Sequence, residues 1–352
     1  FKDGLGENAQ EDAAIDIIGQ FGVGFYSAFM VADKVTVVTR AYGSDTAYQW
    51  VSTGADGYTI TETEKDTVGT DVIMHIKEDE AGEKYSTYLE NWKLMMLIRK
   101  YSDYVRWPIV MDVEQSDWVD TGEKDEKGEP KMEMVTKTEE QTINSMVPIW
   151  QRSRKEATDE ECIAFYKDKF HDKDDPLAVI RVNAEGLISY RALLFIPSKV
   201  PANMYTRDAD PGLELYSSGV MIMDKCTDLL PPCYAFARGV VDSPDLSLNI
   251  SREMLQHDRQ LKLIAANLGK KIKSELTKLM TNDREKYEQF HAAFGMMLRA
   301  GAVTETGDKV DEIKDLLLYH TSETKLVSLK EYVDAMPAEQ AKIYFACGDN
   351  VK

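Results

Sequence analysis

Hydrophobic and polar positions alternate in short runs along the first third of the chain, which is the spacing of half-buried strands. Four such runs predict strands at residues 35–40, 48–51, 58–61 and 70–76. Their hairpin spacing predicts a mixed or antiparallel sheet. Before this sheet, the apolar run 25–31 predicts a buried helix, and after it Leu89, Trp92 and Met96 share one helical face.

Beyond residue 141 the pattern changes to strands mixed with helices. A helix is predicted at 159–169, and strands are predicted at 190–197, 213–216, 220–223 and 235–242. This mixture predicts a layered α/β domain over residues 141–256. Residues 116–140, between the two regions, are charged and poor in apolar side chains. Because such a stretch buries too little surface to offset its ordering entropy, it is expected to be a charged linker or an exposed hairpin tip.

From residue 257 the apolar spacing becomes helical. The stripe of one long helix consists of Leu261, Ile264, Leu268, Ile272 and Leu276. Helical patterns continue at 287–298 and 313–319, so a small helical subdomain is predicted over 257–335. Residues 342–347 have a strand-like pattern, which predicts that 336–352 begin a further small α/β unit.

The charge balance restricts the partners. The 352 residues include 42 Lys and Arg against 61 Asp and Glu, a formal net charge of −19. So acidic a surface repels nucleic acid and anionic membranes, and neither is expected as a partner. The four cysteines form no C-x-x-C pair, so neither a disulfide framework nor a metal site is predicted. No apolar run approaches the roughly 18 residues of a membrane span.

One segment near the start is rich in glycine, Gly19-Gln20-Phe21-Gly22-Val23-Gly24-Phe25. Glycines without Cβ atoms let backbone N–H groups turn into one concavity, and a helix that follows adds the positive end of its dipole. Both features suit a phosphate. The spacing is neither the dinucleotide fingerprint nor the P-loop. From these residues alone, a phosphate cradle and a tight turn before a core helix remain equally open.

A second candidate segment joins the last predicted strand to the long helix. Ser251 is a plausible N-cap, which leaves Arg252 in the first helical turn. A cation there opposes the helix dipole, so another group must favour it. An external anion is one candidate, and an ion pair with Glu253, Asp245 or another nearby acidic residue is the other.

Several segments closely resemble the heat shock protein 90 family of molecular chaperones. The matching segments are residues 18–27, 31–35, 101–104, 194–197, 238–243 and 248–256. The resemblance extends over nearly the whole chain, and the short linker looks most like that of the bacterial members of the family. The opening Phe1 is not an initiator Met, and we expect the chain to be a fragment of a longer protein.

The resemblance implies a fold and an ATP site. Residues 1–115 would be the C-terminal part of an ATP-binding domain of the gyrase–histidine kinase–MutL (GHKL) type, an α/β sandwich, with 1–16 in its lid. The implied ATP contacts are Gly19, Gln20, Phe21, Gly22, Val23, Gly24, Phe25 and Thr70. Arg252 would reach the γ-phosphate, with Asn249 and Gln256 beside the nucleotide.

ATP and Mg²⁺ are the implied cofactors. The family's magnesium ligand, adenine-reading aspartate and general base would lie upstream of Phe1, so the chain alone is expected to be inactive.

The implied partners are unfolded or partly folded client proteins and a second copy, joined through a C-terminal domain, in the cytoplasm. Five large apolar side chains are possible client contacts, although core or ordinary surface positions are the stronger interpretation: Trp107, Trp118, Trp150, Met204 and Tyr205. Two alternatives stay open. One is another GHKL ATPase, of the topoisomerase or mismatch-repair type, which the acidic charge disfavours. The other is a non-enzymatic client-binding adaptor.

Overall fold

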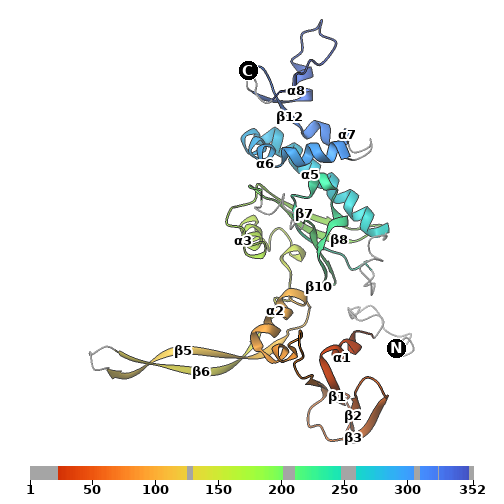
Figure 1. Cartoon of the computed structure of the whole chain (residues 1–352), viewed down its shortest axis with the longest axis vertical. Coiled ribbons are helices and arrows are strands. Elements are labelled where there is room, and N and C mark those ends of the chain that lie inside the picture. Colours follow the sequence, from red (N-terminus) through yellow and green to blue (C-terminus); the bar gives the residue numbers. More distant parts are fainter. Residues whose placement is uncertain are drawn as a thin grey trace. The chain divides into compact units, whose positions relative to one another are not determined.

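The computed structural model describes residues 23–124, 130–200, 211–246, 259–304, 310–323 and 325–348. The chain divides into two compact units, the first formed by 1–103 with 107–144 and the second by 104–106 with 145–352. Both units contain helices and strands, as Figure 1 shows. Within the described ranges, no helix has the length and apolar character needed to cross a membrane.

The first unit contains a four-stranded antiparallel sheet with the order β3-β2-β1-β4. Its strands are β1 (Ala32–Arg40), β2 (Ala47–Ser52), β3 (Tyr58–Thr63) and β4 (Gly69–Ile76). All four predicted strands are therefore confirmed, each one to three residues longer than its sequence pattern. The β-branched run of β1 lies at an interior position, between β2 and β4.

The buried helix expected at 25–31 is wrong. The chain forms a 3₁₀ turn η2 (Val23–Ser27) and a four-residue helix α1 (Ala28–Val31), in which Tyr26 and Met30 are 68% and 72% exposed. So short a helix can turn only part of an apolar run toward the sheet. Helix α2 (Asn91–Tyr101) is as expected, but Trp92 and Met96 on its predicted face are also exposed. Leu89, the third residue of that face, ends the preceding 3₁₀ turn η3 (Tyr85–Leu89) instead.

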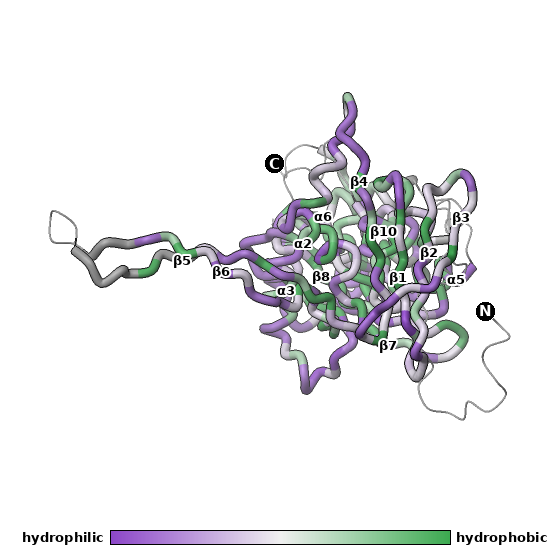
Figure 2. The backbone as a smooth tube through the Cα atoms, turned by 90° about the horizontal axis from the view of Figure 1, so that it is seen from below, coloured by the Kyte–Doolittle hydropathy of each residue, from purple (hydrophilic) through white to green (hydrophobic). Residues whose placement is uncertain are grey.

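The described parts of the charged stretch, residues 116–124 and 130–140, lie in the two strands of a long antiparallel hairpin (Figure 1). Its strands are β5 (Val110–Lys124) and β6 (Pro130–Thr142). The sequence left open a charged linker or an exposed hairpin tip, and where the structure describes this stretch its residues pair as a hairpin. Figure 2 shows hydrophobic and hydrophilic stretches alternating along the described part of this arm. The N–H and C=O groups of the two strands form hydrogen bonds with each other, so even a sequence poor in apolar residues can form this hairpin without a hydrophobic core.

The second unit is built on a five-stranded mixed sheet with the order β10-β9-β11-β8-β7. Its strands are β7 (Ala178–Ala184), β8 (Tyr190–Ile196), β9 (Leu213–Ser217), β10 (Val220–Cys226) and β11 (Arg238–Asp242). Only the β9–β11 pair is parallel. The edge strand β7 was not predicted, although Ile180 and Val182 alternate with polar neighbours as a half-buried strand should.

Each face of this sheet carries its own core. Ala192, Leu194 and Ile196 of β8 join a large cluster with the long helices α5 (Arg259–Asn282) and α6 (Arg284–Thr304). Leu193 and Phe195, which alternate with them, join a smaller cluster. That second cluster includes residues of the short 3₁₀ turn η4 (Ile149–Gln151) and of helix α3 (Asp159–Lys169). Helix α3 has the predicted bounds because Thr158 and Glu161 form a capping box at its start.

The end of the second unit departs from the predicted helices. After α7 (Val310–Ile313) and the 3₁₀ turn η7 (Lys314–Leu316), the chain forms a hairpin of β12 (Leu318–His320) and β13 (Leu326–Ser328). The helical pattern expected at 313–319 is thus wrong beyond Leu316. A last helix α8 (Leu329–Asp334) follows. The strand expected at 342–347 is also wrong: these residues form no helix or strand, and Phe345 is 86% exposed.

Candidate functional site

The predicted nucleotide site is only partly within the described residues. Seven of its predicted members lie outside them: Gly19, Gln20, Phe21, Gly22, Asn249, Arg252 and Gln256. Val23, Gly24 and Phe25 lie in η2, and Thr70 is the second residue of β4. All four of these residues belong to the first unit, and the strand pairing and ring contacts of that unit determine how they lie relative to one another.

Thr70 is held by a neighbour that the sequence did not single out. Strand β4 pairs with β1 so that Thr70 lies opposite Thr39, and the two hydroxyl oxygens are 2.8 Å apart in a hydrogen bond. The preceding Gly69 has φ +126°, a backbone conformation that L side chains rarely adopt. Thr39 sits in the polar-apolar alternation of its strand, but its pairing with Thr70 depends on the register, which a single sequence does not give.

The strand register defines the face of the sheet to which Thr70 belongs. Val37 lies opposite Trp50 on β2 and opposite Val72 on β4. Residues directly opposite each other in antiparallel strands share a face, and residues two apart on one strand do too. Thr39, Thr70, Val72 and Trp50 therefore lie on the same face, and Thr70 and Val72 are exposed there.

The glycine-rich segment ends over this same face. The Phe25 ring packs edge-on against the Trp50 ring, with 5.5 Å between ring centroids, and against Phe29 at 6.4 Å. The Ser27 hydroxyl donates to the Gly24 carbonyl at 2.6 Å, which holds the turn. A Cβ added at Gly24 would meet no atom within 4 Å, so the protein leaves open space beside this backbone.

The arrangement combines two kinds of group that a nucleotide uses. The paired threonine hydroxyls offer a donor and an acceptor for the polar edge of a ring, and the neighbouring apolar side chains offer a surface for its face. The open backbone at Gly24 is able to approach a bulky anion closely. In the described part of the chain, no three His, Cys, Asp or Glu side chains are grouped to hold a metal ion.

Two aromatic side chains considered as client contacts are now located. Trp107 is 65% exposed, whereas Trp150 is 7% exposed and packs against Tyr104 and Tyr216. Trp150 is thus a core residue. Met204 and Tyr205 lie outside the described residues, as does the side chain of Trp118.

Comparison with known proteins gives one consistent answer. The family model described as "Hsp90 protein" matches residues 113–352. The Chaperone protein HtpG of Bacillus subtilis (strain 168) is 54% identical over 346 residues, which is 98% of this chain and 54% of that protein. The proteins of the same name from Oceanobacillus iheyensis and Alkaliphilus metalliredigens are 53% and 51% identical, over 95% and 98% of this chain and 52% and 54% of their own lengths. The chain spans about half the length of these curated relatives. Because the family model matches well over half of the chain, the chain belongs to the Hsp90 family.

Proposed function

We propose that this chain is the section of an ATP-dependent molecular chaperone of the HtpG type that carries part of the ATP site and the middle domain. The proposal rests on one observation above all. The end of the glycine-rich segment and Thr70 lie on the same exposed face of one sheet, in a chain that is 54% identical to a Chaperone protein HtpG. Client proteins and a second copy of the protein are the partners that this family membership suggests.

The proposal gives each part of the site a role. Thr70, oriented by Thr39, would hydrogen-bond the adenine side of the nucleotide, and residues 19–25 would hold its phosphates through backbone N–H groups. Arg252 would contact the γ-phosphate, where a planar cation stabilises the charge that develops during transfer. ATP supplies the phosphoanhydride bond that is hydrolysed.

The function is best tested in a chimera, because the relatives are about twice as long as this chain. In the B. subtilis chaperone, the matching section is replaced by residues 1–352, and ATP hydrolysis and suppression of client aggregation are measured. We expect both activities. Arg252→Ala should lower hydrolysis by at least about tenfold. Arg259→Ala is the control, because Arg259 is exposed at the start of α5, seven residues further along the chain.

The adenine side is tested in the same chimera. Thr70→Val keeps the shape of the side chain but removes its hydroxyl, so ATP affinity should fall about fivefold, the effect of one ordinary hydrogen bond. Thr36→Val is the matched control, since Thr36 lies on β1 but on the opposite face of the sheet. Equal ATP affinity of the two variants would contradict the assignment of Thr70. Suppression of aggregation without any ATP turnover would favour the adaptor function instead.

A further inference from the structure

The connection from β11 to α5 is fastened to the sheet where it begins. This connection carries Arg252, and the structure describes it as far as Leu246. The carboxylate of Asp245 accepts the Ser189 N–H at 2.6 Å, and the Ser243 hydroxyl donates to the Ser189 carbonyl at 2.7 Å. Ser189 directly precedes β8. Two polar side chains of the connection therefore bind one residue of the loop between β7 and β8.

The core and strand β9 hold the next part of the connection. The Leu246 side chain is 1% exposed and belongs to the larger core of the second unit. The Leu246 carbonyl accepts the hydroxyl of Ser217, the last residue of β9, at 3.3 Å. The Ser243 N–H donates to the Tyr216 carbonyl at 3.1 Å. The connection thus leaves the sheet from a defined position.

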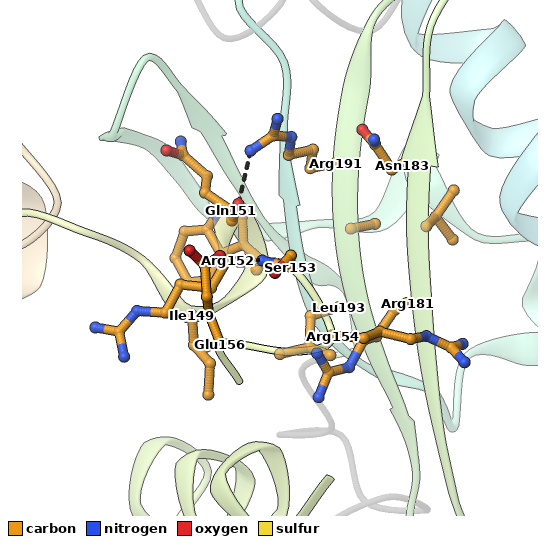
Figure 3. Close-up of a pocket in the computed structure, with 13 residues that line it drawn as sticks. Ile149, Gln151, Arg152, Ser153, Arg154, Glu156, Arg181, Asn183, Arg191 and Leu193 are labelled. Carbon is orange, nitrogen blue, oxygen red and sulfur yellow. Dashed lines mark hydrogen bonds between the residues drawn. The ribbon is translucent and has the colours of Figure 1, made fainter. Parts of the chain in front are cut away.

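Asp242, the last residue of β11, is held by the turn η4. Its buried carboxylate accepts the Trp150 Nε1–H at 3.1 Å and the Gln151 side-chain N–H at 2.9 Å. Gln151 is held in its turn by Arg191 of β8, whose guanidinium donates to the Gln151 carbonyl at 2.8 Å, as Figure 3 shows. Because Arg191 lies opposite Asp242 in the β8–β11 ladder, the strands and η4 together fix the residue from which the connection starts.

The far end of the connection is fixed in the same core. Leu261, in the first turn of α5, is 1% exposed and belongs to the cluster that contains Leu246. Arg252 is six residues after Leu246, which limits its distance from that anchor to about 20 Å of extended chain. A catalytic group that is misplaced by about 1 Å can lose about 100-fold in rate. The anchors at the start of the connection therefore matter for the role proposed for Arg252.

We infer that Asp245 is a positioning residue for Arg252. The inference rests on the proposed function, in which Arg252 contacts the γ-phosphate. From the sequence, Asp245 was a candidate ion-pair partner of Arg252, but in the structure its carboxylate binds the backbone N–H of Ser189. Asp245 is also the anchor best suited to a test. It is exposed, whereas Asp242 and Ser243 are buried, so its exchange opens no core.

The test is ATP hydrolysis by the chimera with the B. subtilis chaperone. Asp245→Ala removes the acceptor of the Ser189 N–H and should lower kcat about fivefold, with the KM for ATP unchanged because no ATP contact is lost. Asp245→Asn keeps an oxygen that accepts this N–H, so it should retain most of the rate. Asp228→Ala is the matched control, because Asp228 is an exposed aspartate of the second unit, in the 3₁₀ turn η5 (Thr227–Leu229), and should leave hydrolysis unchanged.

A double-mutant cycle shows whether Asp245 acts through Arg252. In the Arg252→Ala background, Asp245→Ala should have no further effect, because no guanidinium is left to position. An equal loss of rate in both backgrounds overturns the inference, since Asp245 would then act on another group. An Asp245→Asn variant as slow as Asp245→Ala also overturns it, because the negative charge and not the hydrogen bond to Ser189 would then be needed.

The outcomes separate this inference from the proposed function. If Arg252→Ala lowers hydrolysis and Asp245→Ala does not, the inference fails and the role of Arg252 stands. If Arg252→Ala leaves hydrolysis unchanged, the role of Arg252 fails and the inference fails with it. Circular dichroism verifies folding. If Asp245→Ala does not fold, Ser217→Ala, which removes the hydrogen bond to the Leu246 carbonyl, is the second variant, and an unchanged kcat of that variant overturns the inference.

Discussion

Gly301 of α6 and Gly269 of α5 are both buried helical glycines, but their surroundings are opposite. A Cβ added at Gly301 would lie 2.3 Å from the Cys233 Cβ and 2.9 Å from the Cys233 Cα. Carbon atoms normally approach to about 3.5–4.0 Å, so the overlap is large and involves backbone. A Cβ at Gly269 would first meet the Tyr234 ring at 3.8 Å, an ordinary contact.

The two substitutions by alanine should therefore have opposite effects. Replacing glycine by alanine inside a helix gains about 0.8–1.0 kcal/mol from backbone entropy. At Gly269 this gain should appear almost in full. At Gly301 it is opposed by overpacking, which costs about 1–3 kcal/mol, and contact with a buried backbone favours the upper end. We expect Gly269→Ala to stabilise by about 1 kcal/mol and Gly301→Ala to destabilise by about 2 kcal/mol.

The assay is thermal and urea unfolding of both variants, followed by far-ultraviolet circular dichroism. For a unit of this size, each kcal/mol moves the melting temperature by about 2–4 °C, so the two variants should differ by about 6–12 °C. Cys233→Ala should not rescue Gly301→Ala, because alanine keeps the Cβ that lies closest. A Gly301→Ala protein as stable as Gly269→Ala would refute the close approach of α6 to Cys233.

Two further predictions concern buried polar groups of the second unit. His291 accepts a hydrogen bond from the Leu318 N–H at 3.0 Å, and burial lowers the pKa of His291 to about 4. Because the pKa of His291 in the folded chain lies below its unfolded value of about 6.5, the contribution of neutral His291 to stability is complete above about pH 6.5 and is lost as the pH falls toward 4. In urea titrations between pH 7 and 4, the free energy of unfolding of His291→Gln should therefore fall less than that of the unaltered chain. An identical fall in the two proteins would contradict a buried, neutral His291. The carboxylate of Asp242, 4% exposed, accepts the Trp150 Nε1–H at 3.1 Å and the Gln151 side-chain N–H at 2.9 Å. Asp242→Leu removes the oxygen that accepts both hydrogen bonds, so it should cost about 1–3 kcal/mol in unfolding experiments and alter tryptophan fluorescence, and unchanged values of both would count against the bonds.

The sequence predicted correctly those helices and strands in which the spacing of the apolar residues alone determines which side is buried. The stripe from Leu261 to Leu276 is buried in α5 as a helical period requires. Capping residues near Thr158 fix the start of α3. The strands of the first unit were found because β-branched residues alternate there.

The predictions failed where an element depends on a contact with a residue or strand far away in the sequence. Residues 342–347 have the composition of a strand but pair with no neighbour in the described chain. The charged strands β5 and β6 hold each other through backbone bonds, which composition does not reveal. Thr39 was missed for the same reason, since its role beside Thr70 comes from the strand register. The hydrogen bond from Arg191 to the Gln151 carbonyl joins positions 40 residues apart, and the sequence pattern does not reveal such a contact.

The alternation of side chains along β8 has a consequence for cooperativity. One strand supplies neighbours to both cores of the second unit, and Val240 and Val241 of β11 divide between the two cores in the same way. If either helical layer detaches from the sheet, apolar side chains of β8 and β11 become exposed. The adjacent residues on these same strands pack against the other layer, so that layer is disturbed as well. The two layers should therefore open as one subglobal unit in amide hydrogen exchange, with β8 and β11 at its slowest end. The hairpin of β5 and β6, which belongs to neither of these cores, should exchange independently and much faster.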